Sequence, residues 1–321
     1  MKKKLIISTL IILLILAGCA KNESAETSAS ESPGTGSIDS GGSVPAKVTL
    51  NIGLMPAVDT APIFLAKERG YFNELGLELG ITLFTSAQDR QSALQSGEID
   101  GAMTDLVAVA VNVSGGFDMK ATMLTDGMFP LLALPGAADK GALKVGMMEI
   151  SVSNFLVDQW LSADYEVEKV YINSIPARLE ALASGQLDMG LFPEPIASVG
   201  TLKGLEKLIF KPVDGFSPDV MVFTGKALKD KSSAISMFHE GYNRAIVDIN
   251  RNEEQARDIL ISSIPNLKPE LKNMMNLPEY YEARLPDADY LNKIISWTNG
   301  ILPQKLDVTA ERMVDRSFVK P

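Results

Sequence analysis

Apolar and polar positions alternate along residues 48–54, where Val48, Leu50, Ile52 and Leu54 are separated by Thr, Asn and Gly. A period of two predicts a β-strand. Similar reasoning predicts further strands at 79–84, 101–104, 121–125, 131–134, 144–148, 167–172, 189–192 and 219–224, with helices at 62–69, 90–95, 106–113, 153–161, 176–183 and from 196. Beyond residue 224 the pattern predicts helices only, at 231–250, 253–261 and 287–300. This alternation favours mixed or parallel sheets covered by helices.

One segment of this pattern occurs twice. The residues RQSALQSGEID, from Arg90 to Asp100, recur 88 positions later as RLEALASGQLD, from Arg178 to Asp188. Each copy predicts a helix end, a glycine suited to a left-handed conformation, and a strand. The similarity could instead reflect a common helix-glycine-strand pattern built from frequent residues. Two α/β units are predicted in either case. We therefore expect two similar lobes, each presenting strand tips to a cleft between them.

The predicted fold class is α/β, with two lobes joined by two crossover segments and a helical C-terminal part. Residues 46–134 form the first part of lobe I, residues 135–218 form lobe II, and residues 219–321 return to lobe I as a strand and helices. Crossovers are expected near 135–141 and 212–218, which are rich in Gly and Pro. The terminal helices are expected to pack on lobe I.

The N-terminus has the pattern of an export signal. Three lysines precede an apolar stretch at 5–17 that is too short to span a bilayer. It ends in Leu-Ala-Gly-Cys19, which resembles the lipobox of bacterial lipoproteins. The resemblance implies a signal peptide at 1–18 and lipidation of Cys19, the single cysteine of the chain, so that the protein is anchored at the outer face of the cytoplasmic membrane. Residues 19–45 are rich in Ser, Gly, Glu and Ala and predict a flexible linker. An ordinary secretory signal is the alternative.

Charge and motifs exclude several classes of function. The formal net charge of −10 argues against nucleic acid as a partner. The chain has one histidine, His239, which we expect on a helix surface, and it contains no nucleophile-elbow, phosphate-loop or zinc-protease motif. We therefore expect no catalytic residue, no cofactor, no metal site rich in His or Cys, and no enzymatic activity.

Several longer stretches resemble a known family. LAKERGYF, NELGLELGITLF, ALQSGEIDGAM and ALASGQLDMGLFPEPIAS are similar to the solute-binding lipoproteins of ABC importers for nitrate, sulfonate, taurine and thiamine-precursor pyrimidines. The resemblance covers the chain from about residue 48 to its end. It implies a periplasmic-binding-protein-like clamshell that binds a small molecule between its lobes and docks on a membrane permease. We expect the protein to be a monomer.

Ligands of open α/β sheets bind beyond the carboxyl ends of the strands. Residues that follow the predicted strands are therefore the candidate ligand-binding residues: Asp59, Thr60, Ser86, Thr104, Asp105, Asp126, Met128, Ser151, Ser153, Asn154, Phe192 and Glu194. Some have a simpler explanation. Asp59, Asp105, Ser153 and Asn154 could instead cap helices, and Glu194 could be a solvated turn residue.

The charge of the candidate set suggests a class of ligand. It holds several carboxylates but no Lys or Arg, and we expect Arg90 and Arg178 to face solvent on their helices. A sulfonate or nitrate site would need a guanidinium or several N–H donors. The sequence therefore favours a neutral or cationic nitrogen heterocycle, such as a thiamine-precursor pyrimidine, with Phe192, Phe129 or Phe216 stacked on it. The alternatives are an alkanesulfonate, taurine or nitrate ligand, an enzyme of the same fold that makes pyrimidines or belongs to the menaquinone pathway, and an adhesion or signalling lipoprotein.

Overall fold

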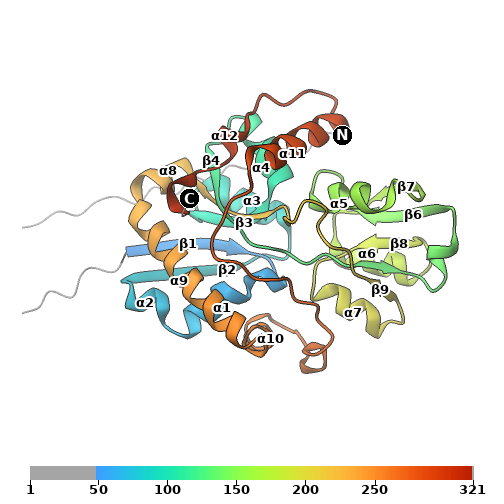
Figure 1. The fold of residues 1–321 in the computed structure, drawn as a ribbon, viewed down its shortest axis with the longest axis horizontal. Helices are drawn as coiled ribbons and strands as arrows, with labels where there is room; N and C mark the ends of the chain where they lie inside the picture. Colours follow the sequence, from blue (N-terminus) through green and yellow to red (C-terminus); the bar gives the residue numbers. More distant parts are fainter. Residues whose placement is uncertain (1–47, 320–321) are drawn as a thin grey trace, which may run out of the picture. The chain divides into compact units, whose positions relative to one another are not determined.

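The computed structural model describes residues 48–319, which contain two five-stranded sheets (Figure 1). The first sheet has the strand order β2-β1-β3-β10-β4. Its strands are β1 (Val48–Leu54), β2 (Leu77–Leu83), β3 (Gly101–Asp105), β4 (Met119–Leu124) and β10 (Asp219–Thr224). Strand β1 runs parallel to β2 and β3, whereas β10 runs antiparallel to β3 and β4.

The second sheet has the order β7-β6-β8-β5-β9 and repeats this arrangement. Its strands are β5 (Leu131–Ala133), β6 (Ala142–Met147), β7 (Glu166–Tyr171), β8 (Met189–Leu191) and β9 (Glu206–Leu208). Strand β6 is parallel to β7 and β8, and β5 is antiparallel to β8 and β9. We call each sheet with the helices packed on it a lobe, numbered I and II.

Two crossovers join the lobes. Each leads into an antiparallel strand, β5 or β10, that lies next to the central strand of its sheet. The first runs from β4 to β5 and the second from β9 to β10. The structure places the first crossover at 125–130, earlier than the predicted 135–141, because Leu131–Ala133 already pairs in the second sheet. The Gly/Pro-rich stretch at 135–141 instead connects β5 to β6 within lobe II. The second crossover, 209–218, includes the predicted 212–218.

Helices cover both sheets. They are α1 (Ala61–Glu68), α2 (Tyr71–Glu74), α3 (Ala87–Ser96), α4 (Leu106–Ser114), α5 (Val152–Leu161), α6 (Ile175–Ala183), α7 (Ile196–Leu202), α8 (Gly225–Asp230), α9 (Ser232–Arg251), α10 (Glu254–Ser263), α11 (Ala288–Ile301) and α12 (Ala310–Met313). Short 3₁₀ turns lie at Val58–Thr60, Ala137–Asp139, Pro269–Leu271 and Arg316–Phe318. None of the helices among the described residues is both long and apolar enough to cross a membrane.

The alternation of residues along the strands of the first sheet separates two hydrophobic cores, one of which continues into lobe II. In β10, Met221 and Phe223 pack with α1, α9 and α10, while Val220 and Val222 pack on the opposite face with α4 and α11. Successive strand residues point to opposite faces, so one apolar strand serves both cores. Helix α9 supplies its core with residues three or four positions apart, among them Ile235, Phe238 and Tyr242. The predicted packing of C-terminal helices on lobe I is thus present (Figure 1).

Candidate functional site

A cavity of about 250 Å³ lies where strand ends of both sheets meet. Its wall in lobe I comes from residues after β1 and β2 and at the ends of β3 and β10: Met55, Pro56, Ala57, Asp59, Thr85, Ala87, Arg90, Met103, Thr104, Asp105 and Asp219, with Phe129 from the first crossover. Its wall in lobe II is Met148, Ser151, Val152, Ser153, Ile175, Pro176, Arg178, Leu191, Pro193 and Ile196. Most of the cavity thus lies beyond the carboxyl ends of parallel strands, where α/β sheets bind ligands.

The repeated sequence builds the same frame on each side of this cavity. Gly97 and Gly185 both adopt left-handed conformations, with φ values of 78° and 79°. The carboxylates of Asp100 and Asp188 each accept a hydrogen bond of 2.8 Å from a backbone N–H, that of Asn51 in β1 and that of Lys144 in β6. The duplicated residues therefore tie the end of α3 to β1 and the end of α6 to β6 in the same way, so the two copies are structurally equivalent.

The repeat arginines lie inside the protein, so the expectation that Arg90 and Arg178 face solvent is wrong. Their side chains are only 8% and 1% exposed, and both line the cavity. Each crosses a glycine of a neighbouring parallel strand, Gly53 in β1 or Gly146 in β6. A Cβ at Gly53 would lie 3.3 Å from Cγ of Arg90, and a Cβ at Gly146 would lie 3.0 Å from Cγ of Arg178. The helix surface that seemed polar in the sequence is turned inward because the missing Cβ atoms leave room for the arginine stems.

Arg90 lies among carboxylates of lobe I. Its Nη2 donates to Oγ1 of Thr104 at 3.0 Å. Burial lowers the pKa of the guanidinium, while Asp105, Asp219 and Asp59 raise it through their charge. This arginine is therefore compensated by acidic neighbours that come from three different segments of the chain.

The same carboxyls are hard to ionise. Burial raises the pKa of Asp59 to about 7, although a 2.9 Å hydrogen bond from Oγ1 of Thr125 lowers it. Burial also raises the pKa of Asp105, and it raises that of Asp219 well above the usual range, with the charges of Asp59 and Asp105 adding to the effect. Lobe I therefore presents a group of buried carboxyls whose charged forms are disfavoured by burial and by one another.

Arg178 has a different environment in lobe II. Its Nη1 donates to the carbonyl oxygen of Ile172 at 2.7 Å, and its guanidinium lies 5.1 Å from the ring centre of Phe192. Within residues 48–319 neither arginine forms an ion pair, and the Nε of each has no hydrogen-bond partner, but Arg178 differs from Arg90 in that no carboxylate raises its pKa. Burial alone lowers its pKa to about 10. The cavity therefore has an uncompensated cation on one side and excess carboxyls on the other.

The start of α5 lies beside Arg178 in the lobe II wall. Oγ of Ser151 accepts from the N–H of Ser153 at 3.1 Å, and Oγ of Ser153 accepts from the N–H of Met148 at 2.9 Å. Asp105 of lobe I lines the cavity with this turn, and the backbone N–H of Val152 lowers the pKa of its carboxyl.

Five of the predicted ligand-binding residues line the cavity: Asp59, Thr104, Asp105, Ser151 and Ser153. The alternative capping role is realised for Asp105, which caps α4 by accepting from the N–H of Ala108 at 2.9 Å. Helix α5 is capped by Ser151 and not by Ser153 or Asn154. Asp59 caps no helix, since its carboxylate accepts from Thr125 instead.

Seven other predicted residues lie outside the cavity wall: Thr60, Ser86, Asp126, Met128, Asn154, Phe192 and Glu194. Ser86 caps α3 by accepting from the N–H of Asp89, and Asn154 donates to the carbonyl of Glu149 at 2.7 Å. Asp126 pairs with Arg284, and burial raises its pKa to about 6. Phe192 is fully buried beneath Arg178. The polar or aromatic groups of these four side chains therefore contact other parts of the protein and do not face the cavity.

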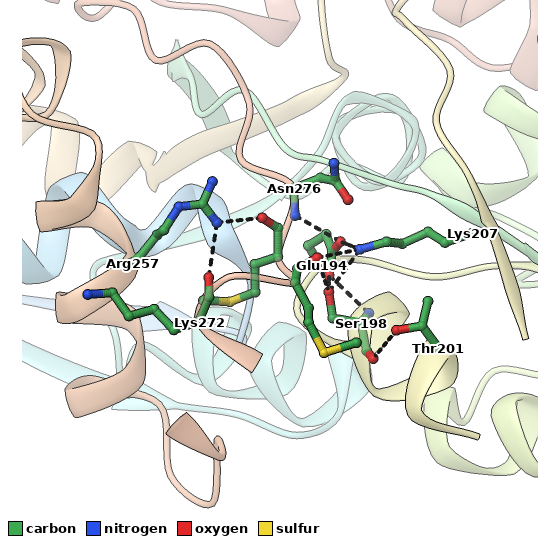
Figure 2. Close-up of polar contacts among 9 residues, drawn as sticks. Glu194, Ser198, Thr201, Lys207, Arg257, Lys272 and Asn276 are labelled. Atoms are coloured by element: carbon green, nitrogen blue, oxygen red, sulfur yellow. Dashed lines mark hydrogen bonds and ion pairs between the residues drawn. The ribbon is translucent and has the colours of Figure 1, made fainter. Parts of the chain in front are cut away.

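Glu194 is fully buried and forms a polar cluster behind the cavity (Figure 2). Its Oε2 accepts from the N–H and Oγ of Ser198 at 3.1 and 2.8 Å. Its Oε1 accepts from Nζ of Lys207 at 2.7 Å and from the N–H of Asn276 at 3.1 Å. Glu194 is therefore neither a solvated turn residue nor part of the cavity wall.

Sequence reasoning missed Arg90, Arg178 and Asp219 as wall residues. Asp219 begins β10 instead of following a strand, and it lies at the cavity because β10 is antiparallel. Each arginine lies 11 residues before the first residue of a buried strand, Arg90 before Gly101 and Arg178 before Met189, on a helix with a polar face. The one available signal was their identity in both copies of the repeat, together with a glycine in the first parallel strand of each lobe, β1 or β6.

His239 is buried, not on a helix surface as expected. Its Nε2 lies 2.9 Å from Oγ1 of Thr122, it is 3% exposed, and burial lowers its pKa to about 4. It does not line the cavity. Among the described residues, no three side chains of His, Cys, Asp or Glu are arranged to hold a metal ion. The predicted signal peptide, the predicted lipidation site Cys19 and the predicted linker lie outside the described residues.

Comparison with known proteins supports the resemblance found in the sequence. Residues 43–199 match the model of the NMT1-like family, so the resemblance is confirmed over this range. No curated protein sequence matches the chain.

Solved structures share the fold at low sequence identity. The ligand-binding component of an ABC-type import system from Staphylococcus aureus is 18% identical, with a TM-score of 0.71 over 84% of this chain and 97% of that one. The alkanesulfonate-binding protein of Xanthomonas axonopodis is 18% identical, with a TM-score of 0.67 over 85% and 99%. The nitrate-binding protein of Synechocystis is 14% identical, with a TM-score of 0.57 over 72% and 68%. The predicted periplasmic-binding-protein-like fold class is confirmed.

Proposed function

We propose that this chain is a solute-binding protein of an ABC importer and that its ligand occupies the cavity between the lobes. The observation that carries the proposal is the cavity itself, because both lobes supply polar side chains to it at the ligand-binding edge of their sheets. Family and fold similarity to importer components agree with it. The chain is a binding protein and not an enzyme.

The location follows from the N-terminal sequence. A signal peptide at 1–18 and lipidation of Cys19 would anchor the protein at the outer face of the cytoplasmic membrane. Two or more acyl chains give stable anchoring, whereas one does not. The linker at 19–45 would let a monomer reach a permease in the same membrane.

The ligand that fits lobe I is a small nitrogen heterocycle with N–H or amino groups, of which a thiamine-precursor pyrimidine is one example. Asp59, Asp105 and Asp219 can accept from such groups, and Phe129 with Met55 and Met103 supplies an apolar wall for a ring. A cationic ring would favour the ionised carboxylates, so its binding would release the protons that burial retains on them. Arg178 would then donate to an oxygen or ring nitrogen at the opposite end.

An anion such as an alkanesulfonate or nitrate is the second candidate, and one observation favours it. Arg178 is a buried guanidinium without a carboxylate partner, and such a group needs an acceptor. The sequence argument against anions depended on the absence of arginine from the site, and that premise is wrong. What remains against an anion is the excess of carboxyls in lobe I.

Calorimetry with chosen probes separates the two candidates. The probes are 4-amino-5-hydroxymethyl-2-methylpyrimidine, ethanesulfonate, taurine and nitrate. We expect the pyrimidine to bind and Asp219→Asn to weaken it by at least about tenfold, the cost of one charged hydrogen bond. Asp230→Asn, which changes an exposed carboxylate paired with Lys226, is the matched control and should bind normally.

Two other outcomes are informative. In the first, a sulfonate or nitrate binds tightly, Arg178→Met abolishes this binding and Asp219→Asn does not change it. That result would show that the ligand is an anion and not a nitrogen heterocycle. A protein that binds none of these probes and releases no small molecule on denaturation, as judged by mass spectrometry, would contradict the proposal of a solute-binding protein.

A further inference from the structure

The cluster around Glu194 connects the two lobes outside the crossovers. Glu194, Ser198 and Lys207 come from the loop after β8, from α7 and from β9, all in lobe II. Besides Glu194, Lys207 donates to Oγ of Ser198 at 3.0 Å and to the carbonyl oxygen of Met274 at 2.6 Å (Figure 2). The side chain of Glu194 is 0% exposed and that of Lys207 is 12% exposed.

The segment that these side chains bind belongs to lobe I. Met275 is buried in the core formed by α1, α9 and α10. Arg257 of α10 donates to the carbonyl oxygens of Lys272 and Met275 at 3.0 and 2.6 Å, so both ends of the turn are fixed to lobe I (Figure 2). Two further backbone groups of this turn bind lobe II: the carbonyl of Met274 accepts from Lys207, and the N–H of Asn276 donates to Glu194.

The backbone of Glu194 makes two more connections. Its carbonyl accepts from the N–H of Val58 in lobe I at 3.1 Å, and its N–H donates to the carbonyl of Met128 in the first crossover at 3.0 Å. Val58 lies between Ala57 and Asp59, and Glu194 lies between Pro193 and Ile196, all four of which line the cavity. One residue thus joins both walls of the cavity from behind.

We propose that the buried Glu194–Lys207 pair is a positioning device, which sets the angle between the lobes before any ligand binds and so forms the cavity. The inference depends on the proposed function only in taking the cavity as the ligand site. Separation of the lobes here would leave Glu194 and Lys207 paired with each other, but the carbonyl of Met274 and the N–H of Asn276 would lose their charged partners, which is costly for polar groups that are partly buried. The pair therefore biases the population toward the arrangement in which the walls face each other.

The distance between the lobes in the ligand-free protein tests this directly. Spin labels are placed on Ser236→Cys in α9 and Gln186→Cys in lobe II, two exposed positions, with Cys19 replaced by serine. Pulsed electron resonance should give one narrow distance distribution for this protein. Glu194→Gln and Lys207→Met should each add a second population at longer distance. Lys203→Met, which removes an exposed ion pair with Glu180 inside lobe II, is the matched control and should leave the distribution unchanged.

Folding must be separated from positioning. Urea unfolding shows whether each variant remains cooperative, and Ser198→Ala, which removes one hydroxyl from the cluster, serves as a milder variant that should broaden the distribution to a smaller extent. A cooperative Glu194→Gln and a cooperative Lys207→Met that both retain the narrow distribution would overturn the proposal. Because no ligand is present, a failure of the importer function would not affect this result.

Discussion

The two copies of the repeat place equivalent arginines at the cavity, yet the two side chains are in opposite electrostatic situations. Arg90 lies near Asp59, Asp105 and Asp219, whereas Arg178 lies against Phe192 and a backbone carbonyl with no carboxylate near it. Burial, the glycine beneath the stem, and the carboxylate that fixes the helix to the strand are the same in both lobes.

This difference shows which parts of the site the duplication controls. The repeat fixes where an arginine enters the cavity, since that depends on residues inside the copied segment and on one glycine of the neighbouring strand. The charge that the arginine meets depends on other segments: the loop after β1, the end of β3 and the return strand β10. The same backbone arrangement can therefore place an arginine in two different electrostatic environments.

The largest expected effects come from removing the charge of each arginine, which tests whether Arg90 and Arg178 lie in different electrostatic environments. Arg90→Met would leave buried carboxyls without their cation, and we expect a loss of about 3–5 kcal/mol in the free energy of unfolding at pH 8. Arg178→Met would replace an unpaired buried cation with an apolar chain of similar length, and we expect a change within about 1 kcal/mol. Urea unfolding measures both. Equal losses in the two variants would show that the environments do not differ as described.

The pH dependence of Arg90→Met sharpens the same test. Without the cation, the carboxyls of lobe I would retain their protons to higher pH, so the loss should be small at pH 5 and largest at pH 8. Arg178→Met should show no such trend, because no carboxyl depends on it.

The shared frame can be tested at the glycines beneath the arginines. A methyl group at Gly53 would lie 2.6 Å from Cδ1 of Ile99, and one at Gly146 would lie 2.5 Å from Cδ1 of Leu187. We expect Gly53→Ala and Gly146→Ala each to cost about 1–3 kcal/mol through overpacking, by similar amounts in thermal and urea unfolding. Gly141→Ala, where nothing lies within 4 Å, is the control. A large difference between the first two would contradict the equivalence of the frames.

The smallest expected effect concerns Asp59, whose pKa burial raises to about 7 from an ordinary value near 3.8. Between these values the folded state holds a proton that the unfolded state has lost, so this group makes the protein less stable as pH rises from about 4 to 7. Asp59→Asn retains an acceptor for Thr125 and removes the titration. We expect it to flatten the dependence of stability on pH by an amount on the order of 1 kcal/mol, because neighbouring carboxyls share the proton.

Comparison of urea unfolding at pH 5 and pH 8 tests this expectation. The free energy of unfolding of the variant, relative to that of the parent protein, should be higher at pH 8 than at pH 5. A parallel dependence in both proteins would mean that Asp59 ionises normally. Asp230→Asn, at an exposed carboxylate, should follow the parent protein at both values.

Much of the fold could be predicted because its signals are local. The alternation along Val48–Leu54, the apolar spacing of Ser232–Arg251 and the glycines at 97 and 185 each reflect the backbone of a few neighbouring residues. The first crossover was misplaced because Leu131–Ala133 is a three-residue strand whose sheet is decided by its partners, β8 and β9, and not by its own sequence.

The candidate site was predictable only where residues lie at or just beyond the carboxyl ends of parallel strands, as Thr104, Asp105 and Ser151 do. Glu194 follows a strand as well, but the cavity wall excludes it because Lys207, Ser198 and the backbone at Asn276 surround its carboxylate. Asp219 enters from an antiparallel strand, which no rule about carboxyl ends would select.

The sequence by itself determined a pair of α/β units with an arginine, a glycine and an aspartate in matching places, since helix ends and strands depend on interactions between near neighbours. Tertiary structure alone decided that both arginines turn inward, that one meets three carboxyls and the other none, and that Glu194 faces Lys207. Burial and charge pairing join residues far apart in the chain, and their energies depend on an environment that only the folded protein creates.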